Sequence, residues 1–215
     1  MHNTKEWHNF FSDFNVFTNS IRLKPFIDDI VSVANREKPI LELGSGSGAT
    51  ARILADMGYT VIATDIDNEV VKGLQANSCN QEDRLRVEWL DMLDIKYKAN
   101  SIGVIIHQGL LEHFSNKMIL KTLSEQARTA DWVVFDVPND RDNEQHYGDE
   151  RFLSYSQWKE LIEEAGLTIV KCTGRMVPRW TYFFPHAFFT NKPGIWSWLG
   201  RRFGKAYIFT CKSQS

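Results

Sequence analysis

The stretch LELGSGSG at residues 41–48 decides the fold of this chain. Apolar residues run directly into three glycines, Gly44, Gly46 and Gly48. This pattern predicts a strand that turns sharply into a helix, because glycine adopts backbone conformations closed to other residues and lets a ligand approach closely. The helix expected next, Ala49–Met57, would offer free N–H groups and a positive dipole end to an anionic group.

Strands and helices are predicted to alternate outward from this stretch. The expected strands are Pro39–Leu43, Thr60–Thr64, Leu85–Leu90, Ile102–Ile106, Trp132–Val137, Leu167–Lys171 and Ala206–Cys211. The helices expected after Ala49–Met57 are Asp67–Ala76, Lys117–Thr129 and a helix from a Ser154 cap to Ala165. Right-handed βαβ units then give a Rossmann-like α/β fold in three layers, αβα, with a mostly parallel sheet of seven strands. No helical pattern fills the gap before the last strand, so that strand is expected to be antiparallel.

Length and composition favour one domain with an appended lid. Residues 1–36 are expected to be the helical lid, with Pro25 in the first turn of a helix Pro25–Asn35. Residues 37–215 would form the main domain, with an insertion at about 174–204 that is rich in aromatic and basic residues. Neither a signal peptide nor a membrane span is recognisable, and the three cysteines fit no disulfide or zinc pattern. The expectation is a soluble, reduced, cytoplasmic protein.

The position of Asp65 suggests a nucleotide-like ligand. Asp65 ends the second predicted strand, about twenty residues after the glycines, where an acid binds ribose hydroxyls in nucleotide-binding α/β folds. On glycines alone the loop also satisfies the dinucleotide pattern, through Gly44, Gly46 and Ala49. Glu42 favours a different ligand, because a carboxylate at the mouth of the loop would repel a pyrophosphate and attract an ammonium and a sulfonium. S-adenosylmethionine (SAM) carries both cations, a carboxylate and a ribose.

The order of these motifs resembles that of class I SAM-dependent methyltransferases. The segments that carry the resemblance are ELGSGSG (42–48), VIATDID (61–67), VEWLDM (87–92), IIHQGLLEHF (105–114) and the late helix ending in EAG (164–166). The match covers about residues 38–175 and the last strand. It implies a final antiparallel strand, transfer of a methyl group from SAM, and S-adenosylhomocysteine (SAH) as the product.

The resemblance also assigns residues to parts of the cofactor. Those for the methionine end are Glu42, Gly44, Ser45, Gly46 and Gly48. Asp65 and Ile66 would bind the ribose and adenine, Asp91 and Met92 would bind the adenine edge, and His107 and Gln108 would lie beneath the sulfonium. Asp67 is better placed to cap the following helix.

Methyl transfer from a sulfonium needs a general base only if the acceptor loses a proton. The candidates are His107, Glu112, His113, His146 and Tyr147, of which His113 and His146 are the predicted catalytic residues. His113 follows the fourth strand, and His146 lies in the loop after the fifth, where ligands of open α/β sheets bind. Asp140, Asp142, Glu144 and His146 are spaced too loosely to predict a metal site.

The insertion and the charge distribution leave the acceptor open. All 27 acidic residues precede Lys171, and eight basic residues follow from there. The aromatic insertion has three interpretations: a lid over a hydrophobic or aromatic small molecule, a dimer or partner interface, or a contact with a membrane surface or nucleic acid. We expect a small-molecule acceptor and a monomer or homodimer. The alternatives are an NAD-dependent oxidoreductase, a SAM-binding regulator without turnover, and an RNA or protein methyltransferase.

Overall fold

The computed structural model describes residues 16–77, 83–141, 149–175 and 204–214. The elements in chain order are α2 (Val16–Val33), β1 (Ile40–Leu43), α3 (Ala49–Asp56), β2 (Val61–Asp65), α4 (Asn68–Ala76), β3 (Leu85–Trp89), β4 (Ile102–Gln108), the short 3-10 helix η1 (Leu111–His113), α5 (Asn116–Thr129), β5 (Ala130–Pro138), α6 (Tyr155–Glu164), β6 (Leu167–Arg175) and β7 (Ala206–Ser213). Every predicted strand is present, and the expected α/β fold is confirmed.

The seven strands form one sheet in the order β3-β2-β1-β4-β5-β7-β6. The strands β1 to β5 are parallel, and β7 lies antiparallel between β5 and β6. The predicted antiparallel last strand is therefore confirmed. The order of the strands reverses at β1, because β2 pairs with one side of β1 and β4 pairs with the other. Open α/β sheets bind ligands at such a switch point, outside the carboxyl ends of the strands.

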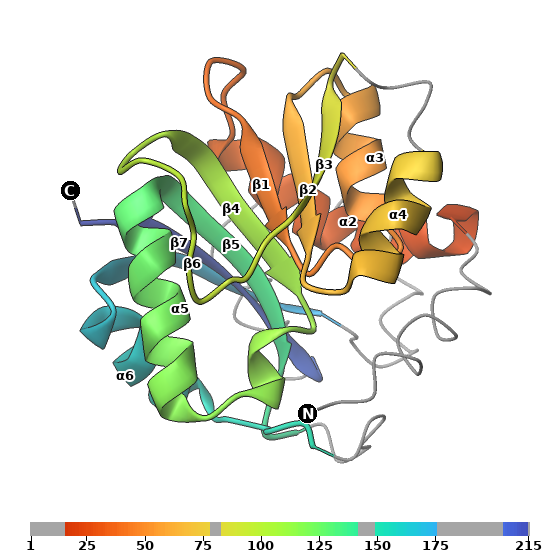
Figure 1. The fold of residues 1–215 in the computed structure, drawn as a ribbon. Helices are drawn as coiled ribbons and strands as arrows, with labels where there is room; N and C mark the ends of the chain where they lie inside the picture. Colours follow the sequence, from red (N-terminus) through yellow and green to blue (C-terminus); the bar gives the residue numbers. More distant parts are fainter. Residues whose placement is uncertain (1–15, 78–82, 142–148, 176–203, 215) are drawn as a thin grey trace.

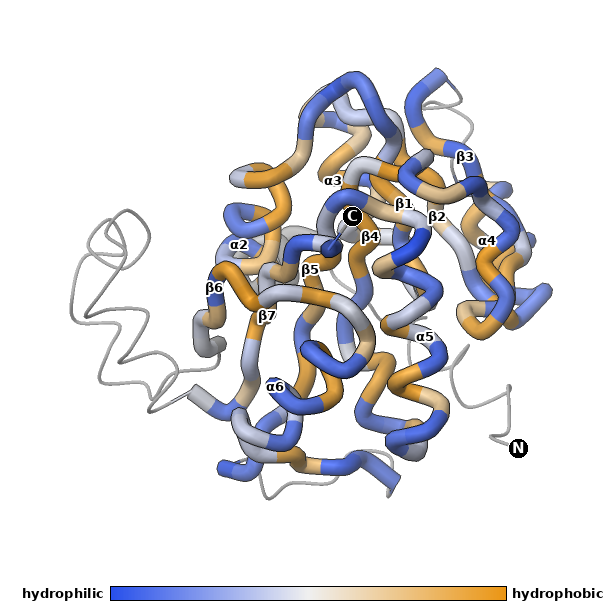
Figure 2. Tube along the Cα trace, turned by 90° about the vertical axis from the view of Figure 1, so that its left-hand side faces the viewer, coloured by the Kyte–Doolittle hydropathy of each residue, from blue (hydrophilic) through white to orange (hydrophobic). Residues whose placement is uncertain are grey.

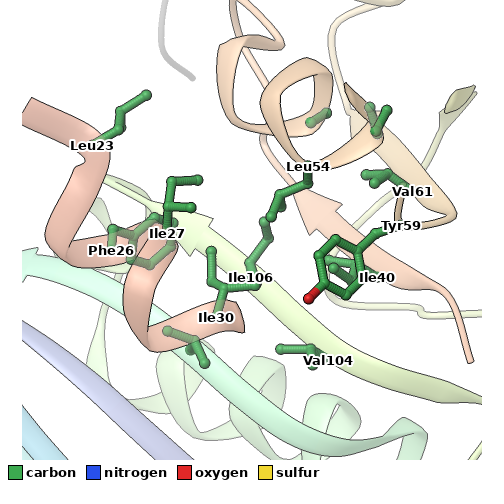
Figure 3. Close-up of a cluster of buried hydrophobic side chains, with 14 of the residues drawn as sticks. Leu23, Phe26, Ile27, Ile30, Ile40, Leu54, Tyr59, Val61, Val104 and Ile106 are labelled. Carbon is green, nitrogen blue, oxygen red and sulfur yellow. The ribbon is translucent and has the colours of Figure 1, made fainter. Parts of the chain in front are cut away.

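Helices cover both faces of the sheet, so the fold has three layers (Figure 1). One face packs against α2 and α3, where Phe26, Ile30 and Leu54 are fully buried (Figure 3). The other face packs against α5 and α6 in a second cluster that includes Trp158 and Phe135. Figure 2 shows apolar residues concentrated along the buried strands and polar residues in the outer turns.

The N-terminal helix differs from its prediction. Pro25 lies inside α2 and does not open a helix of its own. From Leu23 onward the helix packs its apolar side chains onto the sheet, so this part of the predicted lid belongs to the main core. The burial of Leu23, Phe26, Ile27 and Ile30 explains the difference, since packing of an apolar face stabilises a helix more than local propensity does. Residues 1–15 of the predicted lid lie outside the described residues.

The starts of α4 and α6 match local signals in the sequence. Ser154 caps α6 in a reciprocal capping box with Gln157, and Gly166 follows the helix with a φ of 85°. Asp67 caps α4 by accepting a hydrogen bond from the Glu69 backbone N–H at 2.9 Å. These caps satisfy N–H groups that a helix leaves unpaired at its start.

Candidate functional site

The three glycines of residues 44–48 shape a turn between β1 and α3. The φ angles of Gly44, Gly46 and Gly48 are 62°, 49° and 68°. Residues that carry a side chain rarely adopt this left-handed backbone conformation, so the turn depends on glycine. At Gly48 a Cβ atom would also lie 2.5 Å from Leu74 Cδ2 of α4, closer than real contacts permit. Because the glycines have no side chains, the backbone of the turn can lie close to α4 and to a ligand.

Hydrogen bonds tie this turn to β2. The Ser45 backbone N–H donates to the Thr64 carbonyl at 2.9 Å, and the Thr64 N–H donates to Ser45 Oγ at 3.0 Å. The Thr64 hydroxyl donates in turn to the Glu42 carbonyl at 2.7 Å. Ser45, predicted as a cofactor residue, thus holds the shape of the turn through its buried side chain.

Glu42 is a buried carboxyl group beneath the turn. Its side chain lies on the α3 face of the sheet and Glu42 is only 5% exposed. Within the described part of the chain, Oε2 has no hydrogen-bond partner. Burial raises the pKa of Glu42 to about 7, hydrogen bonding from Ser45 opposes this rise, and the charge of Asp65 adds to it. A buried carboxylate of this kind is stabilised by a cation brought in by a ligand.

Asp65 ends β2 and also supports the turn. Its Oδ2 accepts a hydrogen bond from the Gly46 N–H at 3.2 Å, and its Oδ1 accepts one from the Asp67 N–H at 3.0 Å. Burial raises the pKa of Asp65, while these backbone N–H groups oppose the rise. The structure therefore brings the predicted ribose-binding acid into contact with the glycine turn.

An exposed apolar surface lies next to Asp65. Ile66 is 60% exposed and Trp89, at the end of β3, is 51% exposed. The Trp89 indole N–H donates to the Ile66 carbonyl at 2.8 Å, which fixes the ring beside it. The sequence analysis missed Trp89, although a large aromatic residue at the carboxyl end of a strand was a usable signal. A flat, apolar ligand group fits against such a surface.

Asp91 and Met92 follow β3 on the same edge of the sheet. The Asp91 side chain accepts a hydrogen bond from the Leu93 N–H at 2.9 Å, so it caps a local turn. Met92 packs against an apolar cluster that includes Leu41 and Leu43 of β1. Their predicted contact with the adenine edge stays a prediction.

Gln108 connects β4 with α3 and β5. Its Oε1 accepts a hydrogen bond from the Thr50 hydroxyl at 3.2 Å, and its Nε2 donates to Asp136 Oδ2 at 3.4 Å. Asp136 is buried at the end of β5, opposite Gln108 in the strand register. The sequence analysis missed both Thr50 and Asp136, because predicted helices and strands alone do not show which side chains lie close together.

His107 lies apart from this group of residues. Its ring is buried on the opposite face of the sheet, stacked on Phe135 with ring centroids 5.1 Å apart, and its Nε2 lies 3.3 Å from Gln126 Nε2. Burial lowers the pKa of His107 to about 3. The sequence analysis ended this strand at Ile106, but β4 continues to Gln108, and successive strand side chains point to opposite faces. The structure therefore brings Gln108, and not His107, to the glycine turn.

His113 lies at the end of η1 and forms a pair with Asp149. His113 Nδ1 is 2.8 Å from Asp149 Oδ1. The segment before η1 contacts the glycine turn, since Leu110 Cδ1 lies 3.2 Å from the position that a Cβ on Gly44 would occupy. His146 and Tyr147, and nearly all of the 174–204 insertion, lie outside the described residues.

Other kinds of site receive no support from the described residues. They contain no group of three or more acidic, histidine or cysteine side chains able to hold a metal ion. No helix among them has both the length and the apolar character needed to cross a bilayer. Two shallow hollows, one beside Lys38 and Trp132 and one beside Arg84 and Thr60, lie at the amino ends of the strands. They are at the opposite edge of the sheet from the glycine turn.

Sequence comparison gives one family match. Residues 40–131 match the sequence model of a methyltransferase domain. This range begins with β1, contains the glycine turn, Asp65 and Asp91, and ends at the start of β5. No curated protein matches the chain.

Solved structures with the same fold are numerous. A methyltransferase complex with the Trm112 methyltransferase activator from Haloferax volcanii has a TM-score of 0.70 at 16% identity, covering 98% of this chain and 96% of that one. Magnesium protoporphyrin IX methyltransferase from Synechocystis, with bound SAH, has a TM-score of 0.70 at 13% identity, covering 98% and 94%. Geranyl diphosphate C-methyltransferase from Streptomyces coelicolor has a TM-score of 0.64 at 13% identity, covering 91% and 80%.

The fold, the strand order and the domain match agree. At these identities the solved structures establish the fold, and the sequence match adds the domain family for residues 40–131. Residues 40–131 thus match a methyltransferase domain, and the chain has the Rossmann-like fold of SAM-dependent methyltransferases.

Proposed function

We propose that this protein transfers a methyl group from SAM to a small-molecule acceptor. The observation that carries the proposal is the buried carboxyl group of Glu42, unpaired at Oε2 within the described residues, beneath a glycine turn that Asp65 supports. A ligand with an ammonium group and a ribose supplies the missing partner of Glu42 and further hydrogen bonds for Asp65. SAM has both groups.

The residues present fit the parts of SAM. Glu42 and the turn of Gly44, Gly46 and Gly48 would hold the methionine part, and the positive dipole end of α3 suits its carboxylate. Asp65 would bind the ribose. The exposed side chains of Ile66 and Trp89 would contact the adenine, with Asp91 and Met92 at its edge. Gln108, which is hydrogen-bonded to Thr50 of α3, would approach the sulfonium.

The same site disfavours a dinucleotide. A pyrophosphate at the glycine turn would lie close to the carboxyl groups of Glu42 and Asp65, where the charge of Asp65 already raises the pKa of Glu42 by repulsion between like charges. Bringing a further anion there would be unfavourable. The NAD-dependent alternative therefore conflicts with the charge of the site, while a SAM-binding regulator without turnover differs from our proposal only in catalysis.

The proposed reaction is a direct displacement, to which alignment of donor and acceptor contributes most. The sulfonium is an activated leaving group, and holding donor and acceptor in line provides much of the rate enhancement. Where the acceptor must lose a proton, His113 is the candidate base within the described residues. His146 stays a candidate from the sequence.

The structural neighbours act with different kinds of partner. Among the structural neighbours are methyltransferases for magnesium protoporphyrin IX and for geranyl diphosphate, both small molecules, and a methyltransferase in complex with a protein activator. Likeness at 12–16% identity selects no acceptor among them. We propose a small molecule because the aromatic insertion at 174–204 suits a lid over an apolar or aromatic compound.

An SAH-release assay tests the proposal. The purified protein is incubated with SAM and with pools of phenols, amines, and isoprenoid or porphyrin compounds, and SAH is quantified by mass spectrometry. We expect one pool to yield SAH above the rate without acceptor, and no SAH from Asp65→Ala. SAM binding without SAH from any pool would instead favour a regulator, and the absence of SAM binding would refute the proposal.

A further inference from the structure

A histidine–carboxylate pair joins the two loops that follow β4 and β5. His113 Nδ1 lies 2.8 Å from Asp149 Oδ1, within hydrogen-bond distance. The His113 side chain is 7% exposed and that of Asp149 is 31% exposed, so the pair is partly shielded from water. Both loops lie at the carboxyl edge of the parallel strands, which is the ligand-binding edge of such sheets.

Arg151 fixes the two loops against each other. Its backbone N–H donates to the Glu112 carbonyl at 3.0 Å. Its guanidinium donates to the Phe114 carbonyl and to Asn116 Oδ1, each at 2.5 Å. These partners lie on both sides of His113 in the sequence, so the three hydrogen bonds hold the segment that carries Asp149 in register with the ring.

The pair lies close to the proposed cofactor site. Leu110, three residues before His113, packs on the bare backbone of Gly44 in the glycine turn. Gly109 and Gln108, next to Leu110, bond to Asp136 of β5 through a backbone N–H at 3.1 Å and a side-chain amide at 3.4 Å. The stretch from β4 to His113 is thereby attached to the turn on one side and to β5 on the other.

We propose that Asp149 is a positioning residue, which holds neutral His113 in the tautomer with its proton on Nδ1. The proton on Nδ1 is donated to Asp149, and the basic lone pair is then on Nε2. This inference rests on the proposed function and deepens it, since the acceptor is of a class that must lose a proton, such as a hydroxyl or a protonated amine.

The proton balance of this step is simple. The acceptor atom forms its bond to the methyl carbon, and the bond between that carbon and sulfur breaks with both electrons going to sulfur, which gives neutral SAH. The acceptor proton moves to Nε2 of His113. The resulting imidazolium is stabilised by the Asp149 carboxylate and returns the proton to water after product release. The carboxylate keeps its charge throughout.

Nitrogen NMR of the histidine rings tests the tautomer. Protein labelled with ¹⁵N-histidine is compared at pH 8 with Asp149→Asn, and His113→Gln assigns the His113 signals. The asparagine keeps the shape of the side chain but offers an amide N–H to Nδ1, so we expect the ring proton on Nδ1 in the parent protein and on Nε2 in the variant. The same tautomer in both proteins would overturn the proposal. SAH affinity, measured by calorimetry, should be unchanged in Asp149→Asn and shows that the variant is folded.

A kinetic measurement separates this inference from the proposed function. With an acceptor found by SAH release, Asp149→Asn should lower kcat at least a hundredfold, in the range typical of a lost general base, and leave the KM for SAM unchanged. An unchanged kcat would overturn the role of Asp149 while leaving methyl transfer intact. Failure of the parent protein to bind SAH would instead refute the proposed function, whatever the tautomer of His113.

Discussion

The carboxyl group of Glu42 lies in the protein core without a full set of hydrogen bonds among the described residues. Such a group makes the ligand-free fold less stable, and a cationic ligand relieves this. Glu42 is therefore expected both to bind the cofactor and to destabilise the ligand-free protein, and residues at functional sites often have such a cost.

Stability without ligand should depend on pH through Glu42. Its pKa is raised from 4.5 to about 7 in the folded state. A raised carboxyl pKa favours the folded state at low pH, and this contribution is lost as pH rises through about 7. At pH 8 Glu42→Gln should therefore be more stable by up to about 3 kcal/mol, with the difference shrinking toward pH 4.5. Urea unfolding at several pH values measures this, and a variant less stable than the parent at pH 8 would contradict the burial argument.

The affinity for SAM should also depend on the ionisation of Glu42. It should decrease at low pH, where protonation of Glu42 stabilises the ligand-free fold. The ammonium of SAM binds the ionised carboxylate, so affinity should fall as pH decreases below about 7, by at most tenfold per unit. Glu42→Gln should bind weakly at every pH. The matched control is 5′-methylthioadenosine, which lacks the amino-acid part and should show a flatter profile by calorimetry. Equal pH profiles for the two ligands would remove Glu42 from the ammonium site.

Asp65 combines a structural and a binding role. Asp65→Ala loses the hydrogen bonds from Gly46 and Asp67, at a cost of about 1 kcal/mol, and should abolish SAM binding while the protein remains folded. Asp67→Ala is the control, because it loses the α4 cap at a similar cost in stability but should still bind SAM. Calorimetry and urea unfolding measure both effects. Equal SAM affinity in Asp65→Ala and the parent would refute this part of the site.

At the scale of elements, the interior strands followed from apolar runs bounded by glycine, proline and polar residues. The strand Val61–Asp65 and the helix Asn68–Ala76 differ from their predictions by a residue at most. Other elements differed more, among them β6, which continues to Arg175 where Lys171 was its predicted end. Two of the differences have clear physical reasons. The strand β4 runs two residues beyond the apolar run, through a buried histidine, and α2 runs through Pro25 because its apolar face packs on the sheet. Tertiary contacts determine the end of β4 and the start of α2, and no local sequence pattern indicates such contacts.

The attachment of α2 to the sheet gives a prediction at this scale. Asp29 of α2 is buried and forms an ion pair with Lys171 of β6, and it accepts a hydrogen bond from the Thr173 hydroxyl at 3.1 Å. Burial raises the pKa of Asp29, although Lys171 opposes this. Lys171→Ala should lower the free energy of unfolding by about 3 kcal/mol, because it leaves a buried carboxylate without its cation.

The control for this prediction is an exposed ion pair on the same helix. Lys24 and Asp28 are one helical turn apart and exposed. Lys24→Ala should change the free energy of unfolding by less than about 0.5 kcal/mol. Urea unfolding at pH 7 compares the two variants. Equal effects would show that Asp29 and Lys171 contribute no more than a surface pair.

For the whole molecule, the sequence predicted the sheet, its antiparallel last strand and the glycine turn, because these depend on local patterns. It also proposed Glu42 and Asp65 as cofactor-binding residues, since both stand at fixed distances from the glycines in the sequence. It missed Trp89, Asp136 and Asp149, which become neighbours of the site only when strands or loops distant in sequence meet. His107 was predicted to lie beneath the sulfonium, but its ring packs on Phe135 on the face opposite Gln108, because β4 runs two residues beyond its predicted end at Ile106.

Thermal unfolding with SAM, SAH, NAD and NADP, each at saturation, tests the central claim most directly. A ligand that binds only the folded state stabilises it by about 2.7 kcal/mol at a hundredfold excess over its dissociation constant. We predict that SAM and SAH raise the melting temperature of the parent protein and that NAD and NADP leave it unchanged. A rise in melting temperature with NAD or NADP alone would contradict this prediction and would identify the glycine turn as a dinucleotide-binding site.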